Sequence, residues 1–172
     1  MIKKLLPFIV SIAVIVLDQI SKMWIINNLE YYGRGLSYFN DFLRIVWVEN
    51  SGVAFSFGQS FDGILKIVLF IVLPTILVVA LGIIIFINDK TKEFKTYQLY
   101  CLAGIIGGGA GNLIDRITRE FHVIDFISVN MYGLFGFVRF PTFNIADSAV
   151  VVSVALLLLV YLIKERKHEQ KK

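Results

Sequence analysis

Cysteine and histidine are scarce among the 172 residues of this chain. The lone Cys101 excludes an internal disulfide and any metal site built from several cysteines. The two histidines, His122 and His168, are too few for a His-rich metal centre, and no His-Glu-x-x-His run is present. A Gly-x-Ser-x-Gly nucleophile elbow is also missing, which disfavours serine hydrolysis. We therefore expect neither a metal nor another cofactor.

Charged residues are scarce as well. They make up 17% of the chain against 57% hydrophobic residues, and the mean hydropathy is +0.75. A soluble domain of this length would be far more polar. Apolar stretches at about 5–26, 64–87, 97–115 and 143–163 are each close to the roughly 20 residues that a helix needs to cross a bilayer. The sequence predicts an all-α membrane protein with four transmembrane helices in one integral membrane domain, residues 1–172.

Lysine and arginine are unevenly distributed along the chain. They gather in the N-terminus, in the connection at 88–96 and in the C-terminal tail. By the positive-inside rule both termini are cytoplasmic, and the tail is a solvated anchor rather than a nucleic-acid arm. The segments at about 27–63 and 118–142 then lie outside. We expect the first to form a small β-rich segment. The second is rich in Phe and Tyr, and we expect it to lie at the interface against the lipid headgroups.

Glycines crowd the third apolar stretch, at Gly104, Gly107, Gly108, Gly109 and Gly111. A phosphate-binding loop would need a following Lys-Ser/Thr, which is missing here. Small residues four apart let helices approach closely, so we interpret the cluster as a packing surface.

Polar residues gather at one predicted depth, near the outer face of the bilayer. They are Asp18, Asn112, Asp115, Arg116, Asp125 and Asp147. A charge within a span costs at least a few kcal/mol, so each is a candidate functional residue.

Structural roles account for some of these residues. Asp18 and Lys22 are four apart and could form a simple helix ion pair. Asn144 and Asp147 fit a variant capping box, with Asp147 at the favourable end of the helix dipole. These readings leave open a further role for each residue.

Asp115 and Arg116 could likewise anchor the chain at the membrane interface. Asp125 has apolar neighbours on both sides and no obvious structural use. Two carboxyls held close in a partly dry site share a proton, so that one takes a proton from water and the other donates one. This is the chemistry of an aspartic peptidase. The pair titrates as a unit, so the acid and base roles stay open.

Five blocks follow one another along almost the whole chain: 17–22 (LDQISK), 48–56 (VENSGVAFS), 107–116 (GGGAGNLIDR), 123–126 (VIDF) and 143–148 (FNIADS). In this order they resemble lipoprotein signal peptidase (signal peptidase II), a family of bacterial membrane aspartyl peptidases. The resemblance implies that Asp125 and Asp147 are the catalytic dyad. It also implies a set of substrate-binding and supporting residues: Asn50, Gly52, Asn112, Arg116, Asn144 and Ala146, with Asp18, Lys22 and Asp115.

The same resemblance implies the substrate and the setting. The substrate would be a prolipoprotein whose Cys carries a diacylglyceryl group, cut just before that Cys. The partners would be these prolipoproteins, membrane lipids and globomycin-type inhibitors, with no nucleic acid. The protein would be a monomer in the bacterial cytoplasmic membrane, with its active site near the outer face.

A small ion-coupled transporter or channel subunit is the main alternative, because intramembrane acids also mark proton paths. The single depth of the acids and the absence of an inverted repeat in the sequence disfavour it. A phosphatidyl-transferring enzyme is a third option, but its spaced Asp-Gly, Ala-Arg and Asp pattern is missing.

Overall fold

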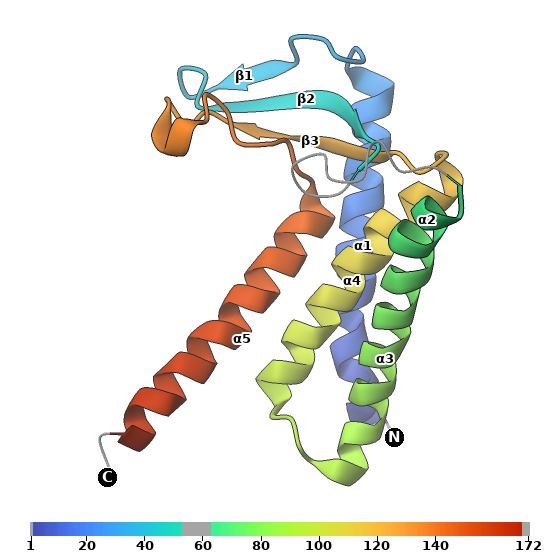
Figure 1. The fold of residues 1–172 in the computed structure, drawn as a ribbon, viewed down its shortest axis with the longest axis vertical. Coiled ribbons are helices and arrows are strands. Elements are labelled where there is room, and N and C mark those ends of the chain that lie inside the picture. Colours follow the sequence, from blue (N-terminus) through green and yellow to red (C-terminus); the bar gives the residue numbers. More distant parts are fainter. Residues whose placement is uncertain (1, 53–62, 170–172) are drawn as a thin grey trace.

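Figure 1 shows the computed structural model, which describes residues 2–52 and 63–169. Its helices are α1 (Ile2–Asn28), α2 (Gly63–Ile67), α3 (Leu73–Thr91), α4 (Thr96–Thr118) and α5 (Ile145–Glu169). A π-helical turn, η2 (Val68–Val72), joins α2 to α3, and the helix runs on without a break. The strands are β1 (Leu36–Tyr38), β2 (Leu43–Asn50) and β3 (Val123–Val129), and a short 3-10 turn, η3, covers Leu134–Gly136.

Three of the described helices are long and apolar enough to cross a membrane: Leu5–Asn28, Gly63–Asn88 and Ile145–Ile163. They coincide with the predicted first, second and fourth spans, which confirms that part of the prediction. The helix α4 does not reach the same apolarity, since its sequence is rich in glycine and ends in polar residues. It lies between the others and packs against α1, α3 and α5. Its modest hydropathy therefore fits a helix that packs largely against other helices.

The glycines of α4 form the predicted packing surface. A Cβ built on Gly107 would lie 2.8 Å from the Val14 Cβ and 2.9 Å from the Ser11 carbonyl oxygen on α1. On the other side, a Cβ on Gly108 would collide with the Ala146 carbonyl oxygen on α5. Only glycine permits both approaches, so α4 draws the start of α5 close to α1.

The antiparallel sheet, in the order β1-β2-β3, lies across one end of the helices (Figure 1). The prediction of strands in 27–63 is correct for β1 and β2. The segment at 118–142 contributes the third strand, β3, which pairs with β2 and was not predicted from the sequence. Val48 lies opposite Asp125, beyond a register shift that follows Ile45. Residues 53–62 of the first outer segment lie outside the described residues.

The alternating side-chain directions of β3 explain why Asp125 has apolar neighbours in the sequence. Ile124 and Phe126 are buried together with Ile25 of α1. Successive side chains of a strand point to opposite faces, so Asp125 points away from this apolar cluster. The strand thus holds a carboxyl on one face by burying its neighbours on the other.

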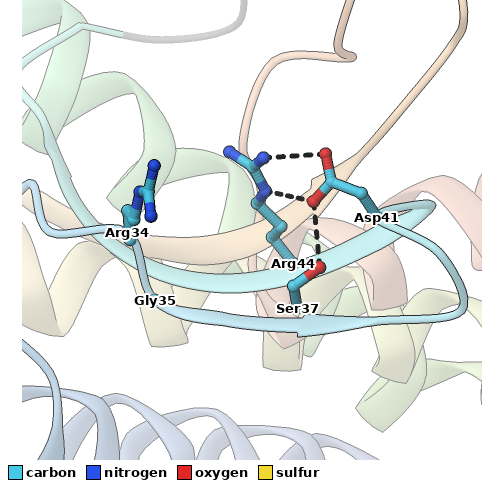
Figure 2. A pocket seen from close by; sticks show the side chains of 5 residues that line it. All are labelled: Arg34, Gly35, Ser37, Asp41 and Arg44. Atoms are coloured by element: carbon cyan, nitrogen blue, oxygen red, sulfur yellow. Dashed lines mark hydrogen bonds and ion pairs between the residues drawn. The ribbon is translucent and has the colours of Figure 1, made fainter.

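The turn between β1 and β2 is held by Asp41, as Figure 2 shows. Its carboxylate accepts hydrogen bonds from the Ser37 hydroxyl at 2.9 Å and from the Arg44 guanidinium, with Nη2 at 2.7 Å. These donors lower the pKa of Asp41 to about 2. A small cavity of about 280 Å³ beside this turn includes Arg34 and Gly35 and holds neither Asp125 nor Asp147.

Candidate active site

Asp125 is 2% exposed and lies near the start of β3. Its two carboxyl oxygens accept hydrogen bonds from side-chain amides, Oδ1 from Asn144 at 2.7 Å and Oδ2 from Asn50 at 3.0 Å. Burial first, and the nearby charge of Asp147 second, raise the pKa of Asp125 from 3.8 to about 7. A carboxyl that holds its proton near neutral pH can act as an acid.

Asp147 lies in the first turn of α5. Its backbone N–H donates to the Asn144 Oδ1 at 2.9 Å, and its Oδ2 accepts the Asn144 backbone N–H at 3.1 Å. This reciprocal pair is the capping interaction expected from the sequence. The remaining oxygen, Oδ1, accepts the Asn112 amide at 2.7 Å. Capping therefore fixes Asp147 in place without occupying all of its oxygens.

Asn144 joins the two acids. It is wholly buried, and its side-chain nitrogen donates to Asp125 while its backbone nitrogen donates to Asp147. The side-chain nitrogen also lies 3.0 Å from the Asn112 Oδ1 and 3.3 Å from the Ile124 carbonyl. The two acids, more than 20 positions apart in sequence, are thus tied to one residue.

Lys22 is wholly buried behind this pair of acids. Its ammonium lies 2.8 Å from Asp18, 2.8 Å from Asp115 and 3.0 Å from the Asn112 Oδ1. The predicted ion pair within α1 is confirmed, and the ammonium adds two partners on α4. Three acceptors match its three N–H donors, which is how a buried charge is tolerated.

Asp18 and Asp115 each hold the start of an element that carries one of the acids. The Asp18 Oδ1 accepts the Ala146 backbone N–H of α5 at 3.0 Å, so one helix caps another. The Asp115 Oδ2 accepts the Ile124 backbone N–H of β3 at 3.1 Å. Asp115 is wholly buried, so the alternative that it anchors the chain at the interface is wrong. Lys22 bridges the two carboxylates and thereby links α5 to β3.

Arg116, in the last turn of α4, lines the same cavity as the two acids. Its guanidinium donates to the Gly52 carbonyl at 3.4 Å and lies 5.5 Å above the ring of Phe70. Among the described residues its Nε is buried without a hydrogen-bond partner. Gly52 in turn donates its N–H to the Asn50 Oδ1 at 3.0 Å, which orients the Asn50 amide toward Asp125. Residues 53–56 of the same sequence block lie outside the described residues.

A cavity of about 1040 Å³ contains both acids. Its polar end is lined by Asn50, Asn112, Arg116, Asp125 and Asp147, and its apolar wall by residues that include Phe140, Phe143, Val150, Val151 and Val152. The cavity thus extends from the carboxyls along α5. Within the described ranges, no three His, Cys, Asp or Glu side chains are grouped so that they could hold a metal.

The comparisons with known proteins agree on one family. A family model described as signal peptidase (SPase) II matches residues 10–163. The chain belongs to the signal peptidase II family. A lipoprotein signal peptidase of Treponema pallidum (strain Nichols) is 40% identical over 165 residues, which are 96% of this chain and 87% of that protein. One of Borrelia hermsii is 36% identical over 95% of this chain and 94% of its own length.

Solved structures also match. One, described as a bacterial membrane enzyme at 2.3 Å, has a TM-score of 0.76 and 27% identity, and the match covers 96% of this chain and 92% of that one. A second, at 1.9 Å, has a TM-score of 0.74 and 28% identity over 91% and 92%. These matches identify an integral membrane protein with the fold of a bacterial membrane enzyme.

In this member of the signal peptidase II family, the residues named from sequence converge on the same place. Gln19 was missed, although it lies within the LDQISK block. Its amide donates to Asp115 at 3.1 Å, to Asp18 at 3.2 Å and to the Gly111 carbonyl at 3.2 Å. Its position next to Asp18 in a matching block was the signal that could have identified it.

Proposed function

We propose that this chain is an aspartic endopeptidase that removes the signal peptide from diacylglyceryl-modified prolipoproteins and cuts just before the lipidated Cys. The observation that carries the proposal is the pairing of Asp125 and Asp147 in one cavity, tied to each other through Asn144. Membership of the signal peptidase II family supports the same reaction.

The chemistry needs one proton shared by the two acids. The ionised member takes a proton from water as the water attacks the scissile carbonyl. The protonated member donates to the carbonyl oxygen or to the leaving amine. The raised pKa of Asp125 supports this arrangement, since the pair retains a proton up to about pH 7. The acid and base roles belong to the pair rather than to either residue.

The wall of the cavity fits a lipid-bearing substrate. Val151 and Val152 line it and are 66% and 56% exposed on α5, which is one of the helices apolar enough to span a membrane. A substrate peptide at the carboxyls would therefore keep its acyl chains in the surrounding lipid. A globomycin-type inhibitor would occupy the same cavity, and one copy of the chain suffices to form it.

The proposal includes a topology. The helix α4 has 23 residues, or about 34 Å, so it is long enough to be the predicted third span. The start of α1 and the end of α5 lie at the end of the bundle away from the sheet (Figure 1). With the basic termini in the cytoplasm, the sheet and the carboxyls would lie near the outer face of the bacterial cytoplasmic membrane.

The transporter alternative gains no support, because the matching proteins are named as peptidases. The deciding experiment uses purified protein in lipid nanodiscs and a diacylglyceryl-modified prolipoprotein. Asp125→Asn and Asp147→Asn should each lower processing by at least about 100-fold, as expected when an acid or base is lost. Asp41→Asn, a change in the sheet turn, is the control and should process normally. Near wild-type processing by either dyad variant would refute the assignment.

A further inference from the structure

The side-chain amides of Asn112 and Asn144 contact the two acids, and the neighbours of each amide fix its orientation. The Asn112 Oδ1 accepts from the Lys22 ammonium at 3.0 Å and from the Asn144 amide nitrogen at 3.0 Å. An ammonium can only donate, so it forces the oxygen of Asn112 to face it. The amide nitrogen of Asn112 is then turned toward Asp147, 2.7 Å away.

The same oxygen fixes the second amide. Because the Asn144 nitrogen donates to Asn112, it faces the interior and places its other N–H on Asp125 at 2.7 Å. The Asn144 oxygen is left to accept the Asp147 backbone N–H at 2.9 Å. One ammonium thus sets the direction of an amide N–H at each carboxyl.

We propose that Lys22 is a positioning residue for the reaction: through the Asn112 oxygen it holds the amides of Asn112 and Asn144 as donors to Asp147 and Asp125, and so keeps one member of the pair ionised. This inference rests on the proposed function of the two acids. Amide donors stabilise a carboxylate over a carboxylic acid. If Asn112 turned over, its oxygen would face an oxygen of Asp147, and only the protonated form of Asp147 would tolerate that contact.

The charge of Lys22 acts in the same direction. Burial raises the pKa of Asp125, and the Lys22 charge opposes that rise. The charged groups behind and beside the pair are Lys22 and Asp18 on α1 and Asp115 and Arg116 on α4. On β2, the neutral Asn50 contacts Asp125, and Glu49 lines the same cavity as the two acids. Removing Lys22 therefore removes both the donor orientation and a positive charge, and both losses favour protonated acids.

The test separates positioning from folding. Lys22→Met alone would leave Asp18 and Asp115 as two buried carboxylates without their ammonium, and the variant could fail to fold for that reason. The double variant Lys22→Met/Asp18→Asn keeps the net charge of the cluster and keeps an oxygen at position 18 to accept the Ala146 N–H. Asp18→Asn alone retains Lys22 and is the matched control.

The measurement is the pH dependence of kcat/KM for a lipidated prolipoprotein in nanodiscs. Relative to the Asp18→Asn control, we expect the profile of the double variant to lie about one pH unit higher, with about a 10-fold lower maximal rate, because these two variants differ only in Lys22 and in the donor that it orients. Asp18→Asn should not move the profile upward. Adding the same two changes to Asn112→Leu should shift the profile by less, because the amide that Lys22 orients is already missing and only the charge of Lys22 is lost.

A folded double variant with the wild-type pH profile would overturn the proposal, and so would a lower rate without a shifted profile. Either result would leave the proposed function intact, since that depends on Asp125→Asn and Asp147→Asn. An active Asp125→Asn enzyme would instead refute the proposed function itself.

Discussion

The proton on Asp125 makes a quantitative prediction about stability. The pKa of Asp125 is about 7 in the folded protein against an ordinary value of 3.8. Between these two pH values the folded state binds one more proton than the unfolded state. The free energy of unfolding therefore falls by about 1.4 kcal/mol for each pH unit as the pH rises from about 4 to about 7. The whole window amounts to about 4 kcal/mol, and above it the contribution is constant.

Asp125→Asn removes this pH dependence. At pH 5, where Asp125 is protonated in the folded wild type, the variant should be the less stable protein. Its new amide nitrogen must face the amide nitrogen of Asn50 or Asn144, which costs about 1–3 kcal/mol. At pH 8 the wild type bears the cost of a buried charge, and the variant should equal or exceed it. The difference between the two proteins should change by about 3 kcal/mol over this range.

Thermal melting of the purified proteins in detergent between pH 5 and pH 8 measures this difference. For a chain of this size about 3 kcal/mol corresponds to about 6–12 °C in Tm. All other titratable groups are common to both proteins, so their contributions cancel in the difference. Asp41→Asn is the control, because the pKa of Asp41 is about 2 and its charge is constant over the range. Parallel melting curves for wild type and Asp125→Asn would refute the reasoning.

Three further predictions concern the surrounding residues. Asp18→Ala should lower the free energy of unfolding by about 3–5 kcal/mol, because it breaks a buried ion pair and removes the cap of α5. Thermal melting in detergent measures this loss, and a stable variant without turnover would instead make Asp18 part of the chemistry. Gly111→Ala should destabilise the protein by about 1–3 kcal/mol in the same assay, since the new Cβ would lie 2.8 Å from the Asp18 carboxylate and 3.2 Å from the Ala146 Cβ. An unchanged melting temperature would show that the helices can separate freely. Processing by the wild-type enzyme should decline as the pH rises through about 7, where the pair loses its shared proton, and a rate that is constant from pH 6 to pH 9 would contradict this.

Local sequence patterns predicted much of the architecture because they report burial. Apolar stretches of the right length located three helices that are long and apolar enough to cross a membrane, and small residues four apart located the packing surface of α4. The capping of α5 was also predictable, because Asn144 and Asp147 lie within one turn. Asp125 stood out for its apolar neighbours, and the alternation of a strand accounts for them.

Contacts between segments that are distant in the sequence could not be predicted from local patterns. The pairing of β3 with β2 joins residues 73 to 86 positions apart, and no turn connects the two strands directly. The cap that Asp18 provides for Ala146 spans 128 positions, and its capping oxygen comes from another helix. Lys22 could be matched with Asp18 by helical spacing, but its contacts with Asp115 and Asn112 depend on how closely α1 and α4 pack.

The ion cluster of α1 and α4 has a consequence for biosynthesis. The helix α1 carries both Asp18 and Lys22, so it can enter a bilayer with its charges already neutralised by each other. The helix α4 brings Asp115, whose cationic partner at 2.8 Å is on α1 and was synthesised earlier. We therefore expect α4 to leave the insertion machinery only when α1 is beside it. The helix α1, which is made first, would thus provide the cation that allows α4 to enter the bilayer.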